Sequence, residues 1–508
     1  MRRTVPAALL LACLAIGVAS PARSATKLEG EYQLQLDIRK QDRFFPWDFE
    51  SNNNDTYAAS QFRLFSQPRT GVEAFVKYEA DWYTGGNENE RPLFHYRESH
   101  VRFARPLGPM TGEAYLFSRQ NRFWVDNHLI RVVDPEQVKD GDNAQGIRFN
   151  LKTPSNVDVF TYIMSDFSSQ SRVGGGAAPT ATDDAHILRW RPVLRENFRL
   201  GATYNRKVIG PASDIDYNEV WALDGRWTFR NTDFYLEFAS AKQKGVNKAD
   251  ADGFHFGDWE IDRFAAALPR NAAVKAELRA ITFGTPSLGY YNIAPLYYYF
   301  GPDFSDFLGE STSDLVGWKM NTWYLLPRRA ITFTFDYEEW EKYVYEVKTF
   351  SRWRVEVYTE YVNGFTSKIW YDRKKTVDNS NPLAEEVTKN YDLFGEVQVE
   401  SRLAWMRVQG KLKDLETNFK KELVSLEAAV NITDRLKLYS RYAFGNDPAR
   451  LRKGLFTELQ YRPQRNMDLY LSYGPFWIGD SNNPVDDGDL AGGADNKDMI
   501  RLIVKGNF

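Results

Sequence analysis

Apolar and polar side chains alternate along most of this chain. Successive residues of an extended strand point to opposite faces, so alternation predicts strands with one apolar and one polar face. The clearest runs are residues 71–82, 352–361, 404–413, 466–473 and 498–508. Such runs of about 9–13 residues suit a tilted strand that crosses a bilayer, whereas strands of soluble sandwiches are usually shorter.

The segments between the runs differ in length. Short turns rich in Pro, Asn and Gly favour tight reversals of the chain, and they lie at 67–71, 152–156, 230–232, 268–272, 326–330 and 462–466. The longer polar segments are 41–56, 121–143, 167–184, 243–254, 285–312, 375–389 and 477–497. Short turns at one end and long loops at the other are typical of bacterial outer-membrane barrels, with the short turns periplasmic.

Counting the runs predicts about 24 strands, within a range of roughly 18–24. The least regular strands are residues 255–267 and 365–374. An even number of strands places both termini on the periplasmic side. The sequence therefore predicts an all-β fold, in which residues 25–508 form one large antiparallel transmembrane barrel with short periplasmic turns and long extracellular loops.

The last strand ends on an aromatic ring. Ile500, Leu502, Val504 and Phe508 share one parity. We expect this strand to pair with the first, because a closed barrel leaves no free edge. The ending resembles the signal that the barrel-assembly machinery reads in many outer-membrane barrels, although Gly506 departs from it. The resemblance implies this machinery as a partner, in addition to outer-membrane lipid.

Residues 1–24 are predicted to be a cleaved secretory signal peptide. Arg2 and Arg3 precede an apolar stretch at residues 7–19, and residues 22–24 form a small-x-small cleavage site. Cys13 is the one cysteine, so the mature chain has no thiol for a disulfide or a metal. Cleavage at Cys13, as in a lipoprotein, is the alternative.

Composition excludes several classes of protein. Mean hydropathy is −0.52 and no apolar run is long enough for a membrane helix, yet 15% of the residues are aromatic. Aromatic girdles at the two membrane interfaces of a β-barrel account for both facts. Without the three arginines of the signal peptide, the formal charge of −3 becomes −6, which favours no nucleic-acid partner.

A barrel of this width cannot be filled by its own side chains, so it holds water, inward-folded loops or a partner. Charges of both signs on the inner parity can simply solvate the wall, or they can select a solute, with Arg and Lys favouring anions. The Arg-rich segment 97–134 enters a long loop that could fold inward. The candidate pore-lining residues are Arg97, Arg102, Arg119, Gln120, Arg122, Asp126, Arg131 and Arg148.

The stretch that begins Ser118-Arg119-Gln120 and continues to Arg131 resembles the Gly-Arg-Gln…Gly…Arg stretch of the alginate-export porin family. Ser118 stands where that family has Gly, and the second Gly is absent. Members of the family are outer-membrane barrels that pass an anionic polysaccharide through an arginine-lined lumen. The resemblance implies that Arg119, Gln120 and Arg131 face the lumen.

No catalytic, metal or cofactor site is expected, and we do not expect an enzyme. His95 and His100 are five residues apart, which places them on opposite faces of a strand, and no GxSxG elbow is present. The aromatic segment 289–304 is expected in an outer loop, as an interface girdle or a sugar-stacking platform.

These observations favour a passive outer-membrane channel of a Gram-negative bacterium. We expect a small polar solute, with anions and saccharides as candidates, and leave the oligomeric state open. Two other functions remain: a barrel sheath for a periplasmic secretion or electron-transfer partner, and an outer-membrane hydrolase.

Overall fold

The computed structural model describes most of the predicted barrel and none of residues 1–24. The described residues are 25–39, 57–83, 93–118, 130, 132, 145–167, 183–192, 194–195, 197–208, 215–245, 269–279, 281–306, 312–326, 330–342, 347–362, 364–380, 385–416, 421–447, 450–474 and 499–507. The described residues contain no helix that is long and apolar enough to cross a membrane.

The described residues form one sheet of strands. Their bounds are β1 (Ala25–Arg39), β2 (Tyr57–Arg69), β3 (Val72–Tyr83), β4 (Leu93–Leu107), β5 (Met110–Ser118), β6 (Gln145–Lys152), β7 (Asp158–Phe167), β8 (Asp183–Trp190), β9 (Phe198–Val208), β10 (Ile215–Phe229), β11 (Thr232–Gly245), β12 (Ala272–Arg279), β13 (Ile281–Thr285), β14 (Gly289–Phe300), β15 (Leu315–Leu326), β16 (Ile331–Lys342), β17 (Lys348–Val362), β18 (Phe365–Asp378), β19 (Glu386–Glu400), β20 (Ala404–Lys413), β21 (Lys421–Thr433), β22 (Leu436–Asp447), β23 (Arg450–Gln464), β24 (Met467–Gly474) and β25 (Met499–Asn507).

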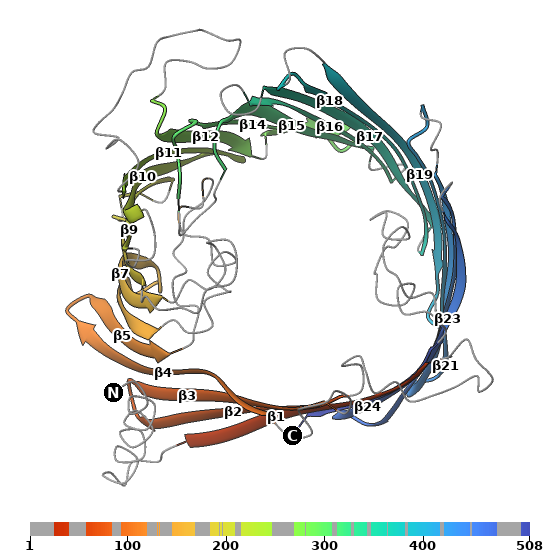
Figure 1. Cartoon of the computed structure of the whole chain (residues 1–508), viewed down its shortest axis with the longest axis horizontal. Coiled ribbons are helices and arrows are strands. Elements are labelled where there is room, and N and C mark those ends of the chain that lie inside the picture. The colour runs from red at the N-terminus through yellow and green to blue at the C-terminus, as the bar shows by residue number, and fades with distance from the viewer. Residues whose placement is uncertain are drawn as a thin grey trace.

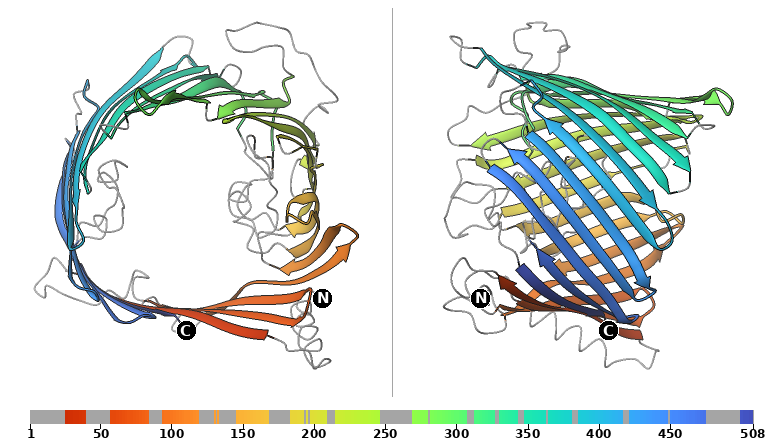
Figure 2. Two further views of the ribbon diagram at one scale, coloured as in Figure 1. Left: turned by 180° about the vertical axis from the view of Figure 1, so that it is seen from behind. Right: turned by 90° about the vertical axis from the view of Figure 1, so that its right-hand side faces the viewer.

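The strands close into a barrel (Figure 1). Each strand pairs antiparallel with its neighbours, and β25 returns to pair with β1. The segments β12 and β13 both pair with β14 and together make one position in the wall, so the described residues form a 24-strand barrel. The strands are steeply tilted (Figure 2), as closure requires. The prediction of a closed, all-β antiparallel barrel of about 24 strands is confirmed.

The prediction for residues 285–312 is wrong, and the strand predicted at 255–267 is not found between its expected neighbours. The segment expected to be an outer loop, 285–312, contains strand β14, and the tight turn lies at residues 286–288. Residues 255–267 lie outside the described residues, and β11 pairs directly with β12, so the wall has no strand between these two. The predicted turn at 268–272 is therefore at the long-loop end, where β12 begins. The other weak strand, 365–374, is part of β18.

Apolar and polar side chains are sorted between the two faces of the barrel. Trp221 and Leu223 are 61% and 63% exposed, whereas Asp224, of the opposite parity on the same strand, is 7% exposed. Side chains on the concave face of a closed sheet crowd together, and those on the convex face do not. The exposed apolar parity is therefore the outer face, and the buried polar parity lines the interior, as the alternation predicted.

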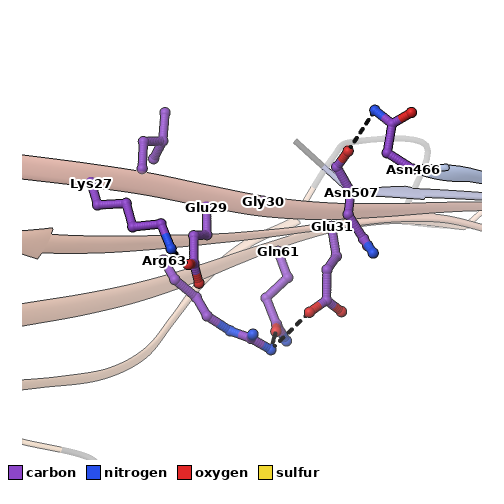
Figure 3. Close-up of a pocket in the computed structure, with 9 residues that line it drawn as sticks. Lys27, Glu29, Gly30, Glu31, Gln61, Arg63, Asn466 and Asn507 are labelled. Carbon is purple, nitrogen blue, oxygen red and sulfur yellow. Dashed lines mark hydrogen bonds and ion pairs between the residues drawn. The ribbon is translucent and has the colours of Figure 1, made fainter.

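The first and last strands meet along a continuous seam. Pairing runs from Glu31 opposite Asn507 to Arg39 opposite Met499, so both ends of the described chain lie at the short-turn end. Asn466, in the β23–β24 turn, donates its side-chain amide to the carbonyl of Asn507 at 3.0 Å (Figure 3). Ile500, Leu502 and Val504 have the outer parity, and Phe508 lies outside the described residues.

A polar cavity of about 570 Å³ lies beside this seam. Arg63 donates to Gln61 at 2.5 Å and lies 3.1 Å from the Glu31 carboxylate, so the charged groups of the cavity are largely paired with one another (Figure 3). The lining residues are Lys27, Leu28, Glu29, Gly30, Glu31, Gln61, Arg63, Asn466 and Asn507.

The aromatic ring opposite position 506 accounts for the glycine at this position of the last strand. Gly506 pairs with Tyr32 on the outer face, and a Cβ at position 506 would collide with the Tyr32 ring. We predict that Gly506→Val displaces this ring and destabilises the seam by about 1–3 kcal/mol, the usual cost of overpacking. The measurement is the temperature at which the folded barrel loses its fast migration in an SDS gel.

Gly395→Val is the matched control, because a Cβ at this outward-facing glycine meets nothing within 4 Å. Equal destabilisation by the two variants would show that the Tyr32 contact is not responsible.

Candidate functional site

A network of charged side chains crosses the inner wall from β3 to β7. Arg102 of β4 donates to Glu73 of β3 at 3.2 Å and forms a close ion pair with Glu113 of β5. Lys152 of β6 lies 3.0 Å from Glu113 and 4.0 Å from Asp158 of β7. Opposite charges thus alternate over five neighbouring strands, and each charge is compensated where the wall is crowded.

Two of the predicted pore-lining residues, Arg102 and Arg148, lie in this part of the wall. Arg148 of β6 donates to Asn150 at 2.9 Å and lies 3.7 Å from Asp158. Its register partner Tyr115 is also the partner of Arg102, so both arginines project to the same side of the sheet.

The structure leaves the other predicted residues largely undescribed. Arg97 is the extra residue of a β-bulge between Tyr96 and Glu98, and its side chain is outside the described part of the chain. The remaining members of the predicted set lie outside the described residues: Arg119, Gln120, Arg122, Asp126 and Arg131.

A hollow of about 360 Å³ opens beside the network, and aromatic rings form much of its lining. The His100 ring is 5.3 Å from Phe75 and 6.0 Å from Tyr115, between centroids, and its Nε2 is 3.6 Å from Glu73. The Arg102 guanidinium forms one side of the hollow, and a third of its side chain remains exposed. A polar group that enters here meets a flat apolar surface next to the Arg102 cation and the Glu73 carboxylate.

The inner wall continues across β8–β10 with a buried ion pair. Arg189 donates to Asp224 at 2.9 Å and to the Thr203 hydroxyl at 2.9 Å. Gly201 makes this possible, because a Cβ at position 201 would collide with the guanidinium of Arg189. Both charged groups are almost fully buried, so this pair stabilises the wall and is not available to a solute.

Sequence reasoning missed the charged network on the other side of the barrel. Arg352 of β17 donates to Asp372 of β18 at 2.6 and 2.9 Å. Glu427 of β21 accepts from Arg407 of β20 at 2.9 Å and from Arg441 of β22 at 3.2 Å. The alternation placed Arg352 and Arg407 on the polar face of their strands, but only the strand register shows which charges meet.

Aromatic rings lie beneath cations on this side as well. Trp370 and Phe394 stack with centroids 5.2 Å apart, on adjacent strands. The guanidinium of Arg354 lies 4.2 Å from the centre of the Trp370 ring, and the Lys411 ammonium lies 4.9 Å from it. These cation–π contacts cover the rings and hold the cations at the inner surface.

A third part of the inner wall is apolar and contacts chain segments from the long-loop end of the barrel. Small side chains on β10, β11 and β12 leave space that is filled by Ile130, Val132 and Phe304. The amide of Ile130 donates to the Glu237 carboxylate at 3.0 Å, and Asn205 donates to the carbonyl of Val132 at 2.5 Å. Part of the predicted loop 121–143 therefore contacts the interior of the barrel. The small residues are Ala222, Ala239, Ala241 and Ala273.

The chain is similar in fold to solved outer-membrane proteins, and one of the matches has a TM-score above 0.5. A cryo-EM structure of the E. coli P pilus tip assembly intermediate PapC-PapD-PapK-PapG matches with a TM-score of 0.53 and 6% identity, covering 96% of this chain and 62% of that chain. The siderophore receptor PirA from Pseudomonas aeruginosa gives 0.46 and 8%, covering 96% and 81%. Wzi, a carbohydrate-binding outer-membrane β-barrel from Escherichia coli, gives 0.34 and 10%, covering 71% and 81%.

No protein-family model and no curated protein matches the sequence. The closed fold, the apolar outer face and the charged inner face define a large β-barrel of the outer-membrane class. The comparisons give no support to the resemblance to the alginate-export porin family.

The buried pair on β8–β10 yields a stability prediction. Arg189→Met leaves the Asp224 carboxylate buried without its partner, which we expect to destabilise the barrel by about 3–5 kcal/mol. The double variant Arg189→Met/Asp224→Leu removes both charges and recovers most of this loss. Heat-dependent gel migration of the folded barrel measures both effects, and equal instability of the single and double variants would contradict the role of the ion pair.

The apolar part of the inner wall yields a second prediction. Ala239→Phe fills the space that Ile130 and Val132 occupy, so the inward segment is displaced and single-channel conductance in planar bilayers changes. Ala276→Phe adds the same side chain on the opposite, outward-facing parity of the adjacent strand and serves as the control. Identical conductance of the two variants would show that the inward segment does not influence the passage.

Proposed function

We propose that the protein is an outer-membrane channel through which a polar solute diffuses. The observation that carries the proposal is the combination of a 24-strand closed barrel with an inner wall of paired charges. Barrels of 16 or more strands are too wide to be filled by the side chains of the wall, so the lumen holds water or inward-folded segments beside water. A polar wall serves hydrated solutes and offers little to apolar ones.

The orientation that we propose places the short turns in the periplasm and the long loops outside the cell. Both ends of the described chain lie at the short-turn end, which agrees with the usual arrangement of bacterial barrels. Residues 1–24 would be the signal peptide that directs export.

Selectivity is proposed to come from the charges that stay partly exposed. Arg102 keeps a third of its side chain exposed beside the aromatic hollow, whereas Glu113, its closest partner, is 2% exposed. Glu73, the other acid that Arg102 contacts, is 36% exposed and lines the same hollow, so a solute meets a cation and an acid together. Such a pair offers donors and acceptors to the polar groups of saccharides, and Arg102 is the member that favours anions. Without support for the family resemblance, we assign no particular polysaccharide.

The test is conductance and ion preference in planar bilayers. We expect steady conductance from the wild-type protein and, in Arg102→Gln, an anion-to-cation permeability ratio lower by about two- to fivefold. The reason is that one charge a few ångströms from an ion in water-like surroundings contributes about 0.5–1 kcal/mol.

Arg465→Gln is the control, since Arg465 is exposed in the β23–β24 turn, away from the inner wall. Unchanged selectivity in Arg102→Gln would remove this residue from the passage. A folded wild-type barrel without conductance would instead favour a sheath for a partner and contradict the channel itself.

A further inference from the structure

Three cationic side chains lie together on the outer face of β18 and β19. Lys375 pairs in register with Lys389, and Arg373 lies two residues before Lys375 on the same parity as the outward-facing Ile369. Paired residues are about 5 Å apart and residues two apart on a strand about 7 Å apart, so the three charges, here called the outer cationic patch, are close neighbours.

The outer cationic patch lacks acidic partners. Among the described residues, none of its three side chains takes part in an ion pair or a hydrogen bond, and the buried Nε of Arg373 has no acceptor. Arg373 instead lies over the Tyr391 ring, 5.6 Å from its centre. Like charges directly opposite each other destabilise a sheet, so Lys375 facing Lys389 favours a bound anion between them.

An inward-facing cation on the same strand, by contrast, has an acidic partner. Lys374, the immediate neighbour of Lys375, lies 3.9 Å from the Asp372 carboxylate. On the outer face, the row through Lys375 reaches Glu339 on one side, with Ser351 between them. On the other side, Glu416 after β20 interacts electrostatically with Tyr371, but among the described residues it forms no ion pair with the three cations. Glu339 accepts a hydrogen bond from Tyr337 at 2.9 Å, so this acid has a partner of its own.

The order of side chains along β18 places the patch relative to the bilayer. From the short-turn end to the long-loop end, the outer parity carries Ile369, Tyr371, Arg373 and Lys375. Tyr371 contacts Trp353 with ring centroids 5.2 Å apart, and Tyr337 contacts Trp318 at 4.7 Å. Aromatic girdles mark the edge of the apolar region, so the cations lie beyond it, at the level of lipid headgroups.

We propose that the outer cationic patch binds the phosphate-bearing headgroup of a lipid in the leaflet on the long-loop side. This rests on the proposed orientation of the barrel in the outer membrane. Phosphate oxygens accept hydrogen bonds from several donors at once, and one Arg with two Lys on a rigid sheet provides donors that no ion pair occupies.

The experiment measures lipid retention on the intact barrel in detergent by native mass spectrometry. The probes are lipid A, which carries two phosphates, phosphatidylcholine, and inorganic pyrophosphate alone. We expect the wild type to retain lipid A over phosphatidylcholine, and Lys375→Gln/Lys389→Gln to lose about tenfold or more of it, because each cation near anionic lipid contributes about a factor of five. Lys374→Gln, the inward-facing neighbour, retains lipid A as the wild type does.

Several results would overturn the proposal. The first is that the double variant retains as much lipid A as the wild type, and the second is that Lys374→Gln loses as much lipid A as the double variant. The third is that pyrophosphate binds although lipid A is not retained. The fourth is preferential binding of polyglutamate, which would indicate an acidic protein partner. Heat-dependent gel migration verifies that each variant is folded. Because retention is measured without conductance, failure of the channel proposal and failure of the lipid proposal are distinguishable.

Discussion

The pairing of β25 with β1 is the interaction on which the rest of the structure depends. Backbone amides and carbonyls that face hydrocarbon have no water to bind, so a sheet in a membrane must satisfy all of them internally. The seam, which runs from Glu31 opposite Asn507 to Arg39 opposite Met499, does this for the two strands that would otherwise be edges. An even number of wall positions and a common location for both chain ends follow from that closure.

Closure also determines what the charged residues can do. On the concave face, long polar side chains crowd together, and an unpaired charge there would be costly. The inner wall meets this constraint with ladders of opposite charge, from Glu73 to Asp158 on one side and around Glu427 on another. Most of these charges therefore hold the wall together, and only those with exposed surface, such as Arg102, can act on a solute.

The sequence predicts the fold well because a period of two is a local property. It fails at β14, where residues such as Tyr298 and Tyr299 put aromatic rings on both faces and remove the alternation. The predicted number of strands is nevertheless right, because two errors cancel. The prediction counted a strand at 255–267, which is not in the wall between β11 and β12, and it left out β14. Arg102 and Arg148 were named as candidates from the sequence, but their partners, like those of Glu427, depend on the register between neighbouring strands, which alternation alone does not determine.

The inner wall is not uniform around its circumference. Alanines on β10–β12 leave space for Ile130, Val132 and Phe304, so this side of the barrel is covered by chain segments that contact it directly. Across the barrel in Figure 1, β19–β23 carry charges and rings whose contacts among the described residues are with neighbouring strands of the wall. The interior of the barrel therefore has an apolar, partly occupied side and a charged side, and under the proposed channel function a solute would meet both. Its path is expected to follow the charged side, where hydration lost on entry is replaced by polar contacts.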